Sequence, residues 1–113
     1  MEWVQEFYHH QNIWTTCYSG SVSDMNRHKV SLIEKFAGPG NKQILELGAG
    51  GGQNAVAAAE LGHTVTAIEL VPSLAAIAKE HASASFPESI SIIEGDFYHV
   101  PLPETFDVIC YWD

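Results

Sequence analysis

Five consecutive small residues are the part of this sequence best suited to hold a ligand. Residues 48–52 read Gly-Ala-Gly-Gly-Gly and follow a short apolar run, residues 43–47. Because glycine has no Cβ, such a backbone can turn tightly and approach a ligand closely. Open parallel sheets bind ligands at the carboxyl ends of their strands. If residues 43–47 form such a strand, the glycines lie where a ligand would bind.

An acidic residue follows the next strand-like run. Glu69 stands 21 positions after Gly48, near the end of residues 64–70, which read TVTAIEL. A carboxylate in that place can accept hydrogen bonds from both hydroxyls of a ribose. The two features together predict a site for a cofactor that contains a nucleoside.

The dinucleotide fingerprint, Gly-x-Gly-x-x-Gly, is incomplete in this chain. Counted from Gly48, its final glycine is replaced by Gln53. The pattern that is present is Glu-x-Gly-x-Gly-x-Gly, which begins at Glu46. An NAD(P)-binding domain of an oxidoreductase is therefore kept as the alternative interpretation.

The pattern that begins at Glu46 resembles motif I of the class I S-adenosylmethionine-dependent methyltransferases. The resemblance continues through TAIEL, Gly95-Asp96-Phe97 and FDVICYWD, and covers residues 43–113. It implies an α/β fold, a Rossmann-like parallel sheet with flanking helices, of which this chain carries the first four of seven strands. It also implies S-adenosyl-L-methionine as the cofactor. Residues 46–61 contain no Lys or Arg, which suits a sulfonium cation better than a pyrophosphate.

The resemblance implies cofactor contacts for the residues that match its motifs. They are Glu46, Gly48, Ala49, Gly50, Gly52, Glu69, Leu70, Asp96 and Phe97. Glu46 would position the methionine end, and Glu69 would accept the ribose hydroxyls. Asp96 would accept the adenine amino group, with Phe97 beside the base. An amine donor needs an acceptor and a purine face suits an aromatic wall, so the residue types agree with these roles.

The reaction implied is transfer of a methyl group from a sulfonium to a nucleophile, for which two residues are catalytic candidates. Asp113 closes the tetrad CYWD, where the family places residues that face the methyl acceptor. Tyr18 belongs to an N-terminal aromatic segment that could cover the methyl donor as a lid. The alternative for these aromatic side chains is that they pack in a core. The acceptor itself is predicted to be a small molecule.

Residues 1–40 are predicted to form a helical extension that precedes the sheet. Residues 2–14 carry an amphipathic apolar stripe, and residues 15–21 read as a loop. A second helix is expected after an N-cap at Ser23 and before Gly38-Pro39-Gly40. Its expected apolar face comprises Met25, Leu32, Ile33 and Phe36.

Residues 41–113 are predicted to form the cofactor-binding core. The expected strands are residues 43–47, 64–70, 90–93 and 106–112, with helices at residues 53–61 and 73–83. This alternation predicts a parallel sheet with crossover helices. Because the chain stops at a fourth strand, the exposed edge predicts either a longer parent protein or self-association as a homodimer. A truncated module that binds cofactor without catalysis is a further alternative.

The composition excludes several classes of partner. Five Lys and Arg against fourteen Asp and Glu give a net charge of −9, which opposes binding to nucleic acid and to anionic membranes. No apolar run is long enough to cross a bilayer, and the first residues do not resemble a signal peptide, so a cytoplasmic location is expected. Cys17 and Cys110 are expected to be reduced thiols. The six histidines lack metal-ligand spacing, so no metal site is expected.

Overall fold

The strands form one parallel sheet. A computed structural model describes residues 20–102 and 105–112. The strands are β1 (Gln43–Leu47), β2 (Thr64–Glu69), β3 (Ile90–Glu94) and β4 (Val108–Cys110), in the spatial order β3-β2-β1-β4. The predicted α/β class and the parallel sheet are confirmed.

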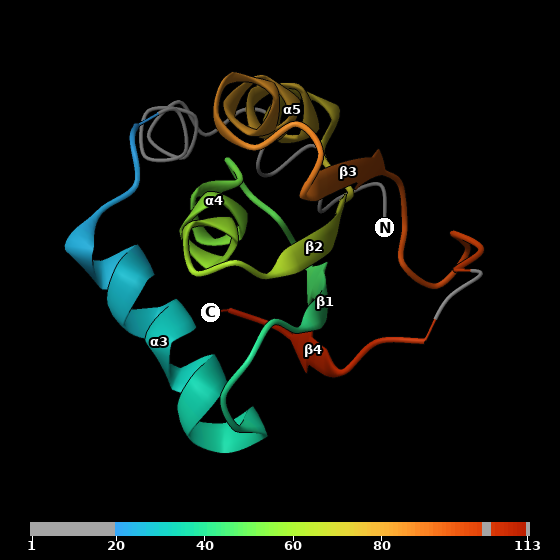
Figure 1. Ribbon diagram of the computed structural model, residues 1–113. Helices are drawn as coiled ribbons and strands as arrows, with labels where there is room; N and C mark the ends of the chain where they lie inside the picture. The colour runs from blue at the N-terminus through green and yellow to red at the C-terminus, as the bar shows by residue number, and fades with distance from the viewer. Residues whose placement is uncertain (1–19, 103–104, 113) are drawn as a thin grey trace.

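The described helices lie side by side along one face of this sheet (Figure 1). They are α3 (Asp24–Ala37), α4 (Gln53–Glu60) and α5 (Pro72–Ser85). The crossovers from β1 to β2 and from β2 to β3 proceed in the same direction, so right-handed connections place α4 and α5 on the same face. Between helices and sheet lies a core of small and branched side chains, which includes Ile44, Ala55, Val65, Ala67 and Ile90.

The order of the strands reverses direction at β1. The chain leaves β1 toward β2 on one side, whereas β4 pairs with β1 on the other side. Ligands of open α/β sheets bind in the crevice outside the carboxyl ends of strands where the order reverses. The topology therefore places the expected binding region beyond the ends of β1 and β4.

The ends of helix α3 agree with the prediction, but the residues that it buries differ from those predicted. Ser23 is the N-cap, and its side chain and that of Asn26 form a reciprocal capping box. The buried residues of α3 are Val30 and Ile33. The expectation for Met25 and Phe36 was wrong, because they are 62% and 80% exposed. Helix α3 packs against α4 through a narrower stripe than the sequence pattern indicated.

Strand β4 is shorter than predicted. Residues 106–112 were expected to be extended, but only residues 108–110 pair, with residues 44–46 of β1. This pairing ends at Glu46 and Cys110, one residue before the end of β1. The other predicted elements of the core agree with the structure to within two residues. The helix predicted for residues 2–14 lies outside the described residues.

Neither a membrane-spanning helix nor a cluster of metal ligands occurs in the described part of the chain. No helix in that part of the chain is long and apolar enough to span a membrane. Residues 20–102 and 105–112 also contain no group of three His, Cys, Asp or Glu side chains that could hold a metal ion.

Candidate cofactor site

The glycine loop turns sharply away from the end of β1. Gly48, Gly50 and Gly52 all have positive φ angles, of 79°, 57° and 82°. These left-handed conformations explain why glycine is needed at alternate positions. The N–H groups of Gly48 and Ala49 both donate to the carbonyl oxygen of Ile68, at 2.9 and 3.1 Å. The loop is thus fixed to the end of β2.

Gly48 leaves an open space at the carboxyl end of β1. A Cβ added to Gly48 would meet no heavy atom within 4 Å. Gly48 is also exposed, whereas the four residues after it are buried. The backbone of Gly48 is therefore accessible to a ligand.

Gly52 serves a different purpose in the same loop. A Cβ at Gly52 would lie 3.1 Å from the Cα atom of Ala78 on α5, and Ala78 is fully buried. Gly52 is also the N-cap of α4. Its lack of a side chain allows α4 and α5 to pack closely behind the loop.

Glu69 connects the loop to the end of β2. Its Oε1 accepts a hydrogen bond of 2.6 Å from the N–H of Gly50, and its Oε2 accepts one of 3.0 Å from Val71. Its side chain is 6% exposed. Burial raises the pKa of Glu69, while the N–H groups of Val71, Gly50 and Leu70 oppose that shift. The carboxylate is held in place and retains lone pairs for further donors.

Glu46 is the most deeply buried carboxyl group among the described residues. It is 1% exposed, and within the described chain neither carboxyl oxygen has a hydrogen-bond partner. Burial and the nearby Glu69 raise the pKa of Glu46 to about 8, and Lys29 opposes this shift. Unpartnered buried carboxyl oxygens are rare because they cost free energy. A donor or cation supplied by a ligand would satisfy them.

A hollow of about 250 Å³ lies where the strand order reverses. Its wall includes Gly48, Ala49 and Gly50 from the end of β1 and Trp112 from the segment after β4. Residues from the helices complete it, among them Asn26, Lys29, Gln53 and Asn54. The amide of Asn26 donates to the side-chain oxygen of Asn54 at 2.9 Å, which joins α3 to α4 at its rim. We call this hollow the switch-point pocket.

Asp96 and Phe97 lie beyond the end of β3. Glu94, the last residue of β3, pairs in register with Glu69, so Asp96 follows at the same edge of the sheet. The side chain of Asp96 is 20% exposed, and its Oδ1 accepts a 2.9 Å hydrogen bond from the N–H of Tyr98. Asp96 and Phe97 do not line the switch-point pocket. They lie along the edge, two strands away from Glu46.

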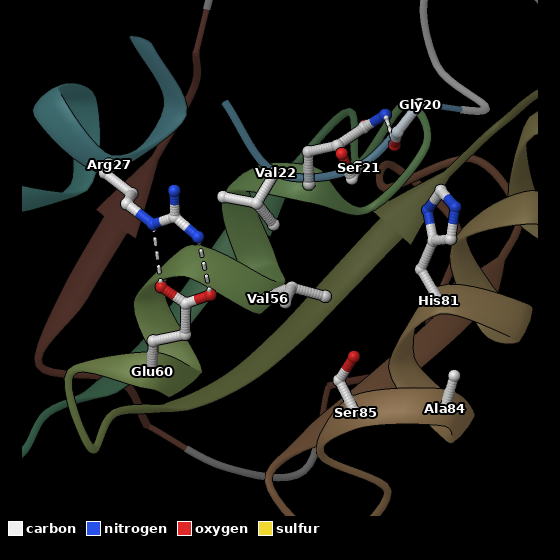
Figure 2. A pocket seen from close by; sticks show the side chains of 10 residues that line it. Gly20, Ser21, Val22, Arg27, Val56, Glu60, His81, Ala84 and Ser85 are labelled. Atoms are coloured by element: carbon white, nitrogen blue, oxygen red, sulfur yellow. Dashed lines mark hydrogen bonds and ion pairs between the residues drawn. The ribbon is translucent and has the colours of Figure 1, made fainter. Parts of the chain in front are cut away.

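A larger hollow, of about 490 Å³, lies between the three helices (Figure 2). Arg27 on α3 and Glu60 on α4 form a two-pronged ion pair at one end, with distances of 3.1 and 3.3 Å. His81 on α5 points toward the hollow, and the Nδ1 atom of His81 lies 2.6 Å from the carbonyl oxygen of Gly51. Because a carbonyl only accepts, that nitrogen carries a proton. This hollow shares Ser21 and Gln53 with the switch-point pocket, but its lining residues come from the helices and from the segment before α3 rather than from the strand ends.

The structure brings several of the predicted residues together. Glu46, the glycine loop and Glu69 lie at the adjoining ends of β1 and β2, and Leu70 follows Glu69 and is half-buried. Tyr18 and Asp113, the two catalytic candidates, lie outside the described residues. Sequence reasoning missed Asn26 and Asn54 as pocket residues. The N-cap at Ser23 and the start of α4 after the glycines were signals that could have placed both at this edge.

Comparisons with known proteins agree with this geometry. Residues 44–113 match the model of a family described as "Methyltransferase domain". The mitochondrial ubiquinone biosynthesis O-methyltransferase of Schizosaccharomyces pombe is 39% identical over 70 residues, which are 60% of this chain and 26% of that protein. The ubiquinone biosynthesis O-methyltransferase of Pseudomonas fluorescens is 31% identical over 92 residues, 78% of this chain and 38% of its own length. The chain therefore spans less than two-fifths of the curated relatives it matches.

A solved structure is similar in fold. Two structures of the glycopeptide N-methyltransferase MtfA superimpose on this chain, each with a TM-score of 0.67. The sequence identity is 21% for the complex with sinefungin and 24% for the complex with S-adenosyl-L-methionine. These alignments cover 81% and 76% of this chain, and 37% and 39% of MtfA. Since the matched family model covers most of the chain and includes β1, the glycine loop and β4, this chain belongs to the methyltransferase-domain family.

Proposed function

We propose that this chain is the S-adenosyl-L-methionine-binding part of an enzyme that methylates an oxygen atom of a small molecule. The proposal is carried by a buried carboxyl, Glu46, that has no hydrogen-bond partner among the described residues, two positions before the open glycine backbone at Gly48. A cationic ligand without phosphates would satisfy the first and approach the second. The absence of Lys and Arg from residues 46–61 agrees with such a ligand.

The residues present suit the parts of this cofactor. Glu46 would hold the methionine end, which carries an ammonium group. Glu69 would accept the ribose hydroxyls with lone pairs not used by Gly50 and Val71. Asp96 and Phe97 would receive the adenine, at the neighbouring strand end. Ala49 and Leu70 would contribute backbone to the same surface.

When bound, the cofactor supplies a methyl group on a sulfonium, which is electrophilic without help from the protein. The residues of this chain would therefore orient the reactants and keep water out. Trp112, Asn26 and Asn54 line the pocket next to Gly48 and are suited to receive the methyl acceptor. Asp113 and Tyr18 remain the proposed catalytic groups, as base and lid residue.

Two findings support a small-molecule oxygen acceptor. Both curated relatives are named O-methyltransferases of ubiquinone biosynthesis. The net charge of −9 opposes the phosphate contacts that a nucleic-acid substrate would need. We include in the proposal a cytoplasmic location, which suits the free thiol of Cys110, and a homodimer formed along the β4 edge, where Ile109 is exposed.

A nuclear magnetic resonance titration tests the cofactor assignment residue by residue. S-Adenosylhomocysteine should shift the amide signals of Gly48, Gly50, Glu69 and Asp96, while NAD should leave them unchanged. Shifts with NAD alone would support the oxidoreductase alternative and overturn the proposal. A transfer assay with labelled S-adenosylmethionine then separates an active enzyme from a module that only binds.

A further inference from the structure

We propose that Glu46 carries a proton in the unliganded protein and gives it up when a cationic group of the ligand binds beside it. Binding of the cofactor would then release close to one proton from the protein. This inference rests on the proposed function, because it concerns the same site.

The first support is the environment of the Glu46 carboxyl. The side chain is 1% exposed, and among the described residues no N–H or O–H group donates to either oxygen. A carboxylate in such a place has lost its water without gaining hydrogen bonds. The neutral acid is therefore favoured over the anion.

The second support is the set of titratable groups that act on Glu46 from the neighbouring elements. Glu69 on β2 is a second carboxyl whose charge disfavours ionisation of Glu46. Cys110 on β4 pairs in register with Glu46, and burial together with Glu46 raises the pKa of that thiol to about 11. Lys29 on α3 is the opposing cation, and it does not overcome burial. The thiol thus stays neutral, and Lys29 is the one charged neighbour in the described part of the chain that favours the anion.

Glu69 differs from Glu46 in a way that identifies which of the two carboxyls holds the proton. Glu69 accepts hydrogen bonds from Gly50 and Val71, and these stabilise its charged form. Within residues 20–102 and 105–112, Glu46 has no such donors. When two close carboxyls compete for charge, the one with donors ionises first. The proton therefore resides on Glu46.

A ligand ammonium group would favour the ionised form of the Glu46 carboxyl over the protonated form. It supplies both an opposite charge and N–H donors, so the carboxylate becomes the favoured form and the proton passes to solvent. Thermodynamic linkage then requires the affinity to rise with pH wherever binding releases a proton. Near neutral pH the expected slope is close to tenfold in affinity per pH unit, and it flattens as Glu46 ionises in the free protein.

Calorimetry in buffers of different ionisation enthalpy measures the number of protons released. With S-adenosylhomocysteine we expect close to one proton at pH 6.5 and a clearly smaller number at pH 8.5. Glu46→Gln should bind more weakly and release almost none at either pH. Glu88→Gln, the same change at an exposed site before β3, should behave as the unaltered protein does.

A second ligand tests the assignment without altering the protein. 5′-Methylthioadenosine contains the adenosine part but has no ammonium group, so it should bind without proton release. Release of the same proton with this ligand would overturn the inference, as would release by Glu46→Gln. Binding of S-adenosylhomocysteine without proton release would overturn the inference alone. Failure of that ligand to bind at all would overturn the proposed function with it.

Discussion

The Oε1 atom of Glu69 lies 2.6 Å from the backbone nitrogen of Gly50, so the carboxylate that ends β2 accepts a hydrogen bond from the loop that follows β1. The neighbouring carbonyl of Ile68 accepts two more N–H groups of that loop. The end of β2 therefore determines the shape of the loop before any ligand binds. Glu69 is thus a structural residue as well as a proposed ligand for ribose.

This double role determines what substitution of Glu69 should do. Glu69→Ala would leave the N–H groups of Gly50 and Val71 without their acceptor, and we expect a loss of about 1–3 kcal/mol in the free energy of unfolding. Its affinity for S-adenosylhomocysteine should fall roughly 10- to 150-fold. Glu69→Gln keeps one acceptor oxygen and should lose less stability. Denaturant unfolding and calorimetry measure the two effects, and unchanged affinity in folded Glu69→Ala would refute the ribose role.

Gly48→Ala separates an effect on binding from an effect on folding. The φ angle of 79° makes any Cβ unfavourable there, by about 1–3 kcal/mol, but the space around it is open. Gly40→Ala is a matched control, with a φ of 96° and equally open space far from the pocket. Both variants should lose similar stability, and only Gly48→Ala should lose at least about tenfold in affinity, or 1.4 kcal/mol. Equal affinities would mean that no ligand approaches Gly48.

Gly52→Ala should destabilise the fold more than either of these. Its Cβ would lie 3.1 Å from the Cα atom of Ala78, a backbone atom that cannot move without shifting α5. We expect a loss about 1–3 kcal/mol greater than that of Gly40→Ala, measured by urea unfolding. A loss equal to that of Gly40→Ala would show that the contact between α4 and α5 relaxes easily.

Much of the fold could be predicted from local sequence signals. Ser23 and Gly38 mark the ends of α3, and the β-branched run after Gly62 indicates β2, because capping and turn chemistry act over a few residues. The exposure of Phe36 could not be predicted in this way. The burial of an apolar residue on α3 depends on where α4 lies, which the sequence of α3 does not contain.

The candidate site was predictable only in part, for a similar reason. The placement of Glu46 and Glu69 at adjoining strand ends follows from a spaced motif, and the pairing of β1 with β2 agrees with it. The switch-point pocket instead combines Asn26, Asn54 and Trp112, which come from three distant segments. Asn26 meets Asn54 through the packing of α3 on α4, and Trp112 follows the strand that pairs with β1. These long-range contacts leave no local pattern in the sequence.

The unliganded protein should lose stability as the pH rises. Because the pKa of Glu46 is raised to about 8 in the folded state, the native protein keeps a proton that the unfolded chain has released above its ordinary value of 4.5. Stability from this group is present below pH 4.5 and is lost as the pH rises through 8. Glu46→Gln should lack this loss and be more stable than the unaltered protein at pH 8.5 by at least about 1 kcal/mol. Urea unfolding at pH 5.5 and 8.5 measures it, and parallel slopes for both proteins would contradict the raised pKa.

His63 should impose the opposite dependence on pH. It is 4% exposed, and its Nδ1 accepts a hydrogen bond of 3.0 Å from the N–H of Lys42, which requires that nitrogen to be unprotonated. Burial, with Lys42, lowers the pKa of His63 below its ordinary 6.5, against a smaller effect of Glu34. The unfolded chain then binds the proton first, so stability falls as the pH drops below 6.5.

The variant His63→Asn isolates this contribution from that of Glu46. Asparagine has no titratable group and its side-chain oxygen can still accept from Lys42. Between pH 7 and 5.5 the unaltered protein should lose up to about 1.4 kcal/mol per pH unit more than the variant does. An identical acid dependence of stability in both proteins would show that His63 is protonated in the folded protein as readily as in the unfolded chain.

The central claim is that this fold binds a nucleoside cofactor of the sulfonium type. Calorimetric titration of the purified chain with S-adenosylhomocysteine tests this claim most directly, and NAD is the parallel control. The account predicts one site per chain, with a Kd of about 1–100 µM, equivalent to roughly 5–8 kcal/mol, and no heat of binding for NAD. Saturable binding of NAD with none of S-adenosylhomocysteine would contradict it.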